Sequence, residues 1–144
     1  MRKLIFLFLI LIVESIYASP SLAASLVINE FLANPSTGGK EWVEIYNPDQ
    51  IDLSTYWVDD DTDFNSDSGN SSKKSLSSII STDPKYPYIE LSSVFNLNDD
   101  FVVLFSSTGT IIDQYQYTSN PGTDVSIGRS TDGGTWATLS TSSK

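Results

Sequence analysis

The chain has 144 residues, a length that suits one domain, and 40% of them are hydrophobic. Eighteen acidic residues against eight basic ones give a net charge of −10, which argues against nucleic-acid binding because phosphate contacts need a clustered positive surface. Histidine and cysteine are both absent, so a disulfide framework, a thiol nucleophile, an imidazole base and an ordinary zinc site are excluded. We therefore predict that the protein is not an enzyme.

The first residues have the pattern of a secretory signal peptide. Two basic residues precede an unbroken apolar run at 4–13, and residues 21–23 supply the small side chains of a cleavage site. The run is shorter than the roughly 20 residues that span a bilayer; a buried helix or an uncleaved anchor is the alternative. We expect removal of residues 1–23, which carry a net charge of +1. This leaves one domain at 24–144, with a net charge of −11 and no membrane span.

The remaining chain alternates short runs of β-branched and aromatic residues with turns rich in Pro, Gly, Asn, Asp and Ser. Such runs at regular spacing, without helical periodicity, favour a β-sandwich or a β-barrel. We expect the side chains of Val43, Ile45, Val103 and Ile127 to lie inside it. The expected strands are residues 25–32, 41–46, 51–53 continuing at 56–58, 76–80, 88–91, 101–105, 110–117, 125–127 and 136–139.

Residues 59–75 are dense in turn formers and acidic groups, and they predict a long, mobile surface loop. Oxygen-bearing side chains recur there at every second position, a spacing that calcium-binding loops use. Neither possible EF-hand register supplies the glycine and glutamate that such a loop needs, so a solvated polar loop is the alternative reading. Calcium is the only cofactor that the sequence suggests. The candidate ligands are Asp59, Asp61, Asp63, Asn65 and Asp67.

Three glutamates on the first two expected strands, Glu30, Glu41 and Glu44, invite comparison with a catalytic carboxylate pair. A glycosidase needs two carboxyl groups facing a sugar cleft, which a small sandwich does not offer. We favour a structural role, in which one or more of these glutamates is partly buried and pairs with Arg129. That guanidinium group would then tie the last strands back to the first.

Several aromatic residues in the second half of the chain allow two interpretations. Tyr86, Tyr88, Tyr115, Tyr117 and Trp136 would make a flat platform for sugar rings if they were exposed on one surface. Aromatic residues on strands more often pack across the sheet, and we favour that interpretation.

Four patches of sequence, in order, resemble the lamin-tail domain family. They are INE at 28–30 followed by Asn34-Pro35, EWVEIYN at 41–47, IDLSTYWVDD at 51–60, and LNDDFVVLFSSTGTIIDQYQY at 97–117 with SIGRSTDGGTW at 126–136. The chain departs from the family pattern at residues 54–57, where Ser-Gly-Trp is usual, and has a longer insert at 61–87. The resemblance implies an all-β, immunoglobulin-like β-sandwich of about seven to nine strands.

For function, the resemblance implies an accessory binding module of the bacterial secreted type. We expect an exported, non-enzymatic module, secreted or associated with the cell envelope, that contacts an unknown protein or glycan partner at the cell surface. A calcium-stabilised carbohydrate-binding module and a non-catalytic fragment of a larger secreted hydrolase are the alternatives. Fold alone does not choose among them.

Overall fold

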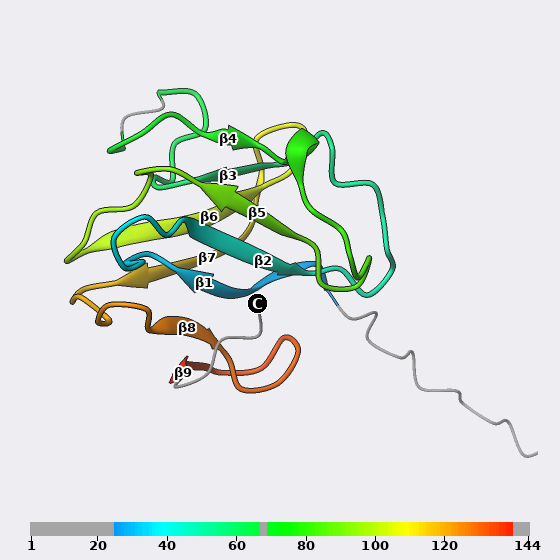
Figure 1. Cartoon of the computed structure of the whole chain (residues 1–144). Coiled ribbons are helices and arrows are strands. Elements are labelled where there is room, and N and C mark those ends of the chain that lie inside the picture. The colour runs from blue at the N-terminus through cyan, green and yellow to red at the C-terminus, as the bar shows by residue number, and fades with distance from the viewer. Residues whose placement is uncertain (1–24, 67–68, 140–144) are drawn as a thin grey trace, which may run out of the picture.

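A computed structural model describes residues 25–66 and 69–139 (Figure 1). The expected signal peptide lies outside the described residues. Within them, nine strands form two antiparallel sheets, so the prediction of an all-β sandwich is confirmed. The five-stranded sheet has the order β5 (Tyr88–Leu91), β2 (Glu41–Tyr46), β1 (Val27–Leu32), β8 (Ser126–Arg129), β9 (Trp136–Leu139). The four-stranded sheet has the order β4 (Lys74–Ser75), β3 (Trp57–Asp59), β6 (Asp100–Phe105), β7 (Ile111–Tyr117).

Two segments expected to be strands are not strands. Residues 51–53 form a loop, because the Asn47 side chain takes both backbone groups of Ile51: it donates to the Ile51 carbonyl at 3.0 Å and accepts from the Ile51 N–H at 3.1 Å. Residues 76–80 instead begin with the short 3₁₀ helix η1 (Leu76–Ser78), where the Ser75 hydroxyl accepts from the Ser77 N–H. Both corrections have one cause, namely a short polar side chain that competes for backbone hydrogen bonds.

The core lies between the two sheets, and its composition follows from the alternation of apolar residues along each strand. Phe31, Val43 and Ile89 are neighbours on β1, β2 and β5, and all three belong to the core. The four residues expected to be buried are buried: Val43, Ile45 and Val103 have no exposed surface, and Ile127 has 7%. Within the described residues, no helix has the length and apolar character needed to cross a membrane.

A β-bulge interrupts β1. Ile28 pairs with Ile45 of β2, but the next pair is Glu30 with Glu44, so Asn29 is the extra residue. The bulge places Ile28 and Phe31, three positions apart, on the same inner face, which strict alternation would not allow. It therefore sends two consecutive polar residues, Asn29 and Glu30, away from the core.

The acidic segment is packed more closely than we expected from its sequence. Its first residue, Asp59, belongs to β3 and has no exposed surface, and its last two form β4. Phe64 anchors the intervening loop, with its ring 5.3 Å from that of Phe105 and 6.2 Å from that of Trp57. The Lys73 ammonium lies 4.7 Å from the Phe64 ring and donates to the Phe64 carbonyl. Phe64 therefore packs the loop against the outer face of the four-stranded sheet, together with hydrogen bonds such as that from the Ser71 N–H to Asp60.

Candidate functional site

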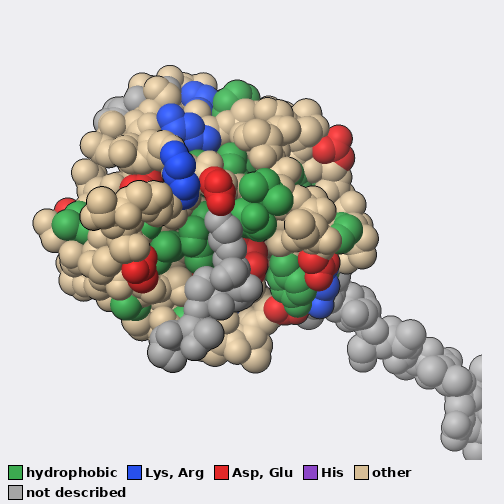
Figure 2. Space-filling model, viewed as in Figure 1, with side chains coloured by type: hydrophobic (Ala, Val, Ile, Leu, Met, Phe, Trp, Pro, Cys, Tyr) green, Lys and Arg blue, Asp and Glu red, His purple; other side chains and the backbone are tan. Residues whose placement is uncertain are grey.

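A pocket of about 600 Å³ lies on the outer face of the five-stranded sheet. Strands β1, β2 and β5 form its floor; the loop between η1 and β5 and the turn between β8 and β9 form its walls. Its volume is within the range of small-ligand sites. Figure 2 looks onto this sheet and shows acidic side chains among hydrophobic ones. The lining residues are Asn29, Glu44, Thr82, Asp83, Tyr86, Tyr88 and Asp132.

The bulge in β1 supplies the most unusual group in this pocket. The side-chain amide of Asn29 donates through Nδ2 to Oε1 of Glu44 at 2.7 Å. Its Oδ1 atom is buried and has no hydrogen-bond partner among the described residues. A buried acceptor without a donor costs about 1–3 kcal/mol, so this oxygen favours a ligand that brings an N–H or O–H group.

Asp132 joins the two walls of the pocket. Its Oδ2 atom accepts from the Tyr86 hydroxyl at 2.7 Å and from the Lys85 ammonium at 3.2 Å. The Lys85 ammonium also lies 5.0 Å from the centre of the Tyr86 ring and 5.2 Å from that of Tyr46. These contacts link the β8–β9 turn to the η1–β5 loop.

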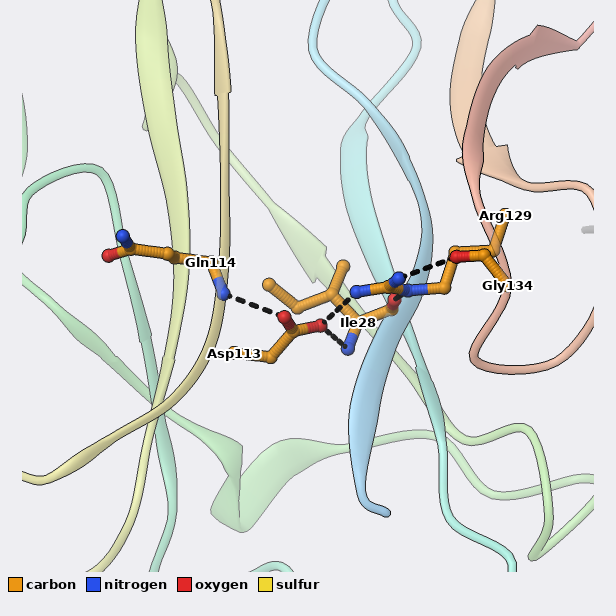
Figure 3. Close-up of polar contacts among 5 residues, drawn as sticks. All are labelled: Ile28, Asp113, Gln114, Arg129 and Gly134. Carbon is orange, nitrogen blue, oxygen red and sulfur yellow. Dashed lines mark hydrogen bonds and ion pairs between the residues drawn. The ribbon is translucent and has the colours of Figure 1, made fainter. Parts of the chain in front are cut away.

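The two sheets are joined beside β1 by an ion pair (Figure 3). Nη2 of Arg129 donates to Oδ2 of Asp113 on β7 at 2.7 Å, and the side chains are 11% and 15% exposed. The same carboxylate oxygen accepts from the Ile28 N–H at 2.9 Å, and Nε of Arg129 donates to the Ile28 carbonyl at 2.8 Å. Nη1 of Arg129 donates to the Gly134 carbonyl at 2.7 Å. Strand β1 pairs with β8 through only two residues. Next to them, the Asp113 and Arg129 side chains bind the N–H and the carbonyl of Ile28, as a neighbouring strand would.

A second group of carboxylates lies at the end of the sandwich where β2 and β6 begin. Oε2 of Glu41 accepts from the N–H groups of Val94 and Phe95 at 2.7 and 3.3 Å. Asp100 accepts from the N–H groups of Asn96 and Phe101 at 2.6 and 2.9 Å. Burial is the main reason that the pKa values of Glu41 and Asp100 are raised, and nearby carboxylates, including Asp60, add to the effect.

Asp59, the last residue of β3, and Asp60, which follows it, are deeply buried acids, with 0% and 2% of their surface exposed. Burial, with the charges of Asp60 and Asp61, raises the pKa of Asp59 to about 7. Oδ2 of Asp60 accepts from the Ser71 N–H at 2.9 Å. Oδ2 of Asp59 and Oδ1 of Asp60 are buried without a hydrogen-bond partner among the described residues.

The expected pairing of a glutamate with Arg129 is wrong in its carboxylate partner, because Arg129 pairs with Asp113. Glu30, Glu41 and Glu44 are buried, with 2%, 7% and 6% exposed surface. Glu30 accepts a hydrogen bond from the Ser126 hydroxyl, Glu41 accepts from two backbone N–H groups, and Glu44 accepts from the Asn29 amide. The guanidinium group still ties the last strands to the first, through the Ile28 carbonyl.

The candidate calcium ligands do not converge in the part of the chain that the structure describes. Oxygens of Asp61 accept from the N–H groups of residues 63 and 69, and Oδ1 of Asp63 accepts from those of Asn65 and Ser66. The contacts from residues 63 and 65 are Asx-type turns, and the contact from residue 69 closes a wider part of the loop. In residues 25–66 and 69–139, no group of three acidic residues is arranged to hold a metal ion. Asp67 lies outside the described residues, so calcium binding stays a prediction.

The five aromatic residues do not form one platform. Tyr115, Tyr117 and Trp136 surround Phe31, with ring centres 5.8, 5.8 and 6.0 Å away, and Tyr117 is only 3% exposed. They pack because Phe31 occupies the middle of the core, where apolar ring surface is removed from water. Tyr86 and Tyr88 instead line the pocket.

Our reading of the sequence missed Asn29, Asp83 and Asp132 as pocket residues. A signal for the first was present, since two apolar residues three positions apart in a strand indicate a bulge. The two aspartates belong to turns far apart in the sequence. Nothing local to either turn predicts that β5 and β9 will bring them to the same sheet face.

Two antiparallel sheets packed face to face define an immunoglobulin-like β-sandwich. A model of the lamin tail domain family matches residues 19–119. Because the match spans more than half of the chain, the protein belongs to the lamin tail domain family. Comparisons with curated proteins and with solved structures found no match. Strands β8 and β9 follow the matched residues. Arg129 is the last residue of β8, and Asp132 lies in the turn between the two strands.

Proposed function

We propose that this lamin tail domain is an exported, non-catalytic interaction module that binds a protein or glycan partner outside the cytoplasm. It is secreted or held at the cell envelope. The observation that carries the proposal is the pocket on the outer face of the five-stranded sheet, which combines two tyrosine rings with three carboxylates. Concave sites that mix aromatic surface with a few polar groups are the usual form of ligand pockets.

The pattern of perturbed carboxyl groups supports a binding role over a catalytic one. Acid–base catalysis needs a group with a shifted pKa inside the site that holds the substrate. Glu41, Asp59 and Asp100 have raised pKa values, but none of them lines the pocket. Each accepts at least one backbone N–H, which fits a role in closing loops. Tyr86 does line the pocket, but its pKa is raised above 10, so its hydroxyl stays protonated near neutral pH and is not a base.

The proposed function is tested by binding to a glycan array and to an array of extracellular proteins. We would compare the wild-type chain, produced with its own leader, with Tyr88→Ala and Asp83→Asn. Asp99→Asn is the control, because it removes one exposed acid that does not line the pocket. We expect signals on one array that both pocket variants lose and the control keeps. Signals unaffected by the pocket variants, or hydrolysis of the probes, would contradict the proposal.

Export is tested separately, by mass spectrometry of the chain after expression with residues 1–23 in place. We expect the mature protein outside the cytoplasm to begin at residue 24, with the sequence Ala-Ser-Leu. A chain that stays in the cytoplasm would contradict export, and an exported chain that keeps residues 1–23 would contradict cleavage after residue 23; both results leave the binding test unaffected.

A calcium-stabilised carbohydrate-binding module is the second candidate. It is favoured by the buried oxygens of Asp59 and Asp60 that have no hydrogen-bond partner among the described residues. A hard cation binds such oxygens, and it would also relieve the mutual repulsion of the acids. Calorimetric titration with calcium chloride, with and without Asp60→Asn, is the test. Heat of binding that the variant abolishes supports this candidate, and absence of heat with an unchanged melting temperature removes it.

A further inference from the structure

The polar lining of the pocket consists mainly of hydrogen-bond acceptors. Glu44, Asp83 and Asp132 contribute carboxylates, and Asn29 contributes an amide oxygen. The donor side of the Asn29 amide is directed to Glu44, and the Tyr86 hydroxyl donates to Asp132. Of the polar groups that line the pocket, few are left to donate to a ligand. A sugar, whose hydroxyl groups both donate and accept, fits such a lining less well than a group that only donates.

The buried Oδ1 of Asn29 also favours a ligand that donates hydrogen bonds, for a reason that does not depend on charge. Asn29 lines the pocket, and this atom has no hydrogen-bond partner among the described residues. Turning the amide over would not correct this, because the resulting exchange would place an oxygen against Oε1 of Glu44. An N–H group of a ligand would supply the donor that this oxygen lacks among the described residues.

We propose that the pocket binds the guanidinium group of an arginine side chain in a basic segment of a partner protein. This inference rests on the proposed function and names the chemistry of its partner. Guanidinium carries five N–H donors and no acceptor, it pairs with carboxylates, and it stacks on aromatic rings. Tyr86 and Tyr88 supply the rings, and Glu44 and Asp83 supply the negative charge, whereas Asp132 is already paired with the Lys85 ammonium.

Arginine fits this lining better than lysine. The acceptors of the pocket lie on its floor and both walls, and a planar guanidinium fork can reach several acceptors at once, whereas an ammonium group is a compact point charge. The protein already places an arginine in this way, since Arg129 donates to a carboxylate and two carbonyls, with its guanidinium carbon 4.5 Å from the centre of the Trp136 ring.

The size and charge of the molecule agree with a peptide-borne group. A pocket of about 600 Å³ is larger than one guanidinium group and has room for the aliphatic part of the side chain and adjoining backbone. The net charge of −10 attracts a basic segment over a distance of about 10 Å at moderate ionic strength. We therefore expect the interaction to weaken as salt is added.

The test is calorimetric titration of the full chain with three blocked pentapeptides, acetyl-Gly-Gly-X-Gly-Gly-amide, where X is arginine, lysine or citrulline. Citrulline has nearly the shape of arginine but no charge. We expect the arginine peptide to bind most tightly, the lysine peptide more weakly, and the citrulline peptide at least about tenfold more weakly than arginine, because a charge-assisted hydrogen bond is lost.

The same titration with Asp83→Asn and Tyr88→Ala locates the binding. Asp83 is exposed and Asn keeps its shape, so we expect a folded protein with about tenfold weaker binding. Asp99→Asn makes the same change of charge away from the pocket and is expected to bind as the wild type does. Circular dichroism of each variant separates loss of binding from loss of fold.

Three results would overturn the inference: equal affinity for arginine and citrulline, no binding of any peptide, or equal weakening by Asp83→Asn and Asp99→Asn. Glycan binding that only the pocket variants lose would then leave the proposed function standing with a different ligand. Absence of pocket-dependent binding on every array and with every peptide would remove both.

Discussion

Asp113 and Arg129 belong to different sheets and form an ion pair, and both side chains also hydrogen-bond the backbone of β1. Oδ2 of Asp113 lies 2.7 Å from Nη2 of Arg129, and the two side chains bind the N–H and the carbonyl of Ile28 on β1. Strands β1 and β8 pair through only two residues each. The Asp113 and Arg129 side chains therefore supply hydrogen bonds to β1 where backbone pairing with β8 has ended. A sandwich without disulfides holds its sheets together here by charge and hydrogen bonding.

Removing either partner of this ion pair is expected to destabilise the protein strongly. Arg129→Ala and Asp113→Ala should each lower the free energy of unfolding by about 3 kcal/mol, because each leaves a largely buried charge and a backbone group of Ile28 unpaired. The double variant should lose less than the sum of the two, and Arg129→Lys less than Arg129→Ala. Urea unfolding measures all four. An unchanged midpoint for Arg129→Ala would show that the pair is not structural.

The stability of the fold should depend on pH through Asp59. Burial raises the pKa of Asp59 from 3.8 to about 7, so between these values the folded protein keeps a proton that the unfolded chain has released. The free energy of unfolding should therefore fall as the pH rises from about 4 to about 7, by up to roughly 3 kcal/mol from this group. The raised pKa values of Glu41 and Asp100 act in the same direction.

Asp59→Asn isolates this contribution. It keeps an acceptor for the Asp60 N–H and removes the charge, so the variant should be more stable than the wild type above pH 7 and should show a shallower pH dependence. Asp49→Asn, at an exposed position, should change neither property by more than a few tenths of a kcal/mol. Parallel slopes for Asp59→Asn and the wild type would mean that Asp59 ionises normally.

Gly109 should not tolerate a side chain. Its φ of +79° is unfavourable for other residues, and an added Cβ would lie 2.4 Å from Cδ1 of Phe64, the residue that anchors the acidic loop. We expect Gly109→Ala to cost about 2–3 kcal/mol and to change the fluorescence of Trp57, which contacts Phe64. Gly133 is the matched control, with φ +69° and open space around its Cβ position, and Gly133→Ala should cost only about 1 kcal/mol. Equal losses of unfolding free energy in the two variants would show that contact with Phe64 does not exclude a side chain at Gly109.

Glu41 should act as a hydrogen-bond acceptor for the loop before β6. Glu41→Ala leaves the N–H groups of Val94 and Phe95 without their acceptor in a buried site, at a cost of about 3 kcal/mol. Glu41→Gln keeps an acceptor oxygen and removes a charge that burial disfavours, so it should cost less than about 1 kcal/mol. Thermal unfolding at pH 7 distinguishes the variants. A glutamine variant as unstable as the alanine variant would show that the negative charge is required.

Much of the fold could be predicted from local pattern. The bounds of β2 and β9 agree with the expected 41–46 and 136–139, because each is a short apolar and aromatic run closed by turn residues. Pattern failed where a polar side chain took over backbone groups, as Asn47 does at Ile51 and Ser75 does at η1. It also failed for Asp59, whose burial depends on a loop that Phe64 holds in place from outside the strand.

By itself, the sequence determined an all-β sandwich or barrel, its principal buried residues and the exclusion of thiol and imidazole chemistry, because composition and alternation act within a few residues of each position. The choice of a sandwich came from the resemblance to the lamin-tail domain family. Only the tertiary structure decided that Arg129 pairs with Asp113 and that Asn29, Asp83 and Asp132 share one pocket. The physical reason is distance along the chain. Partners more than a hundred residues apart, such as Asn29 and Asp132, meet through sheet order and register, and no local propensity encodes either one.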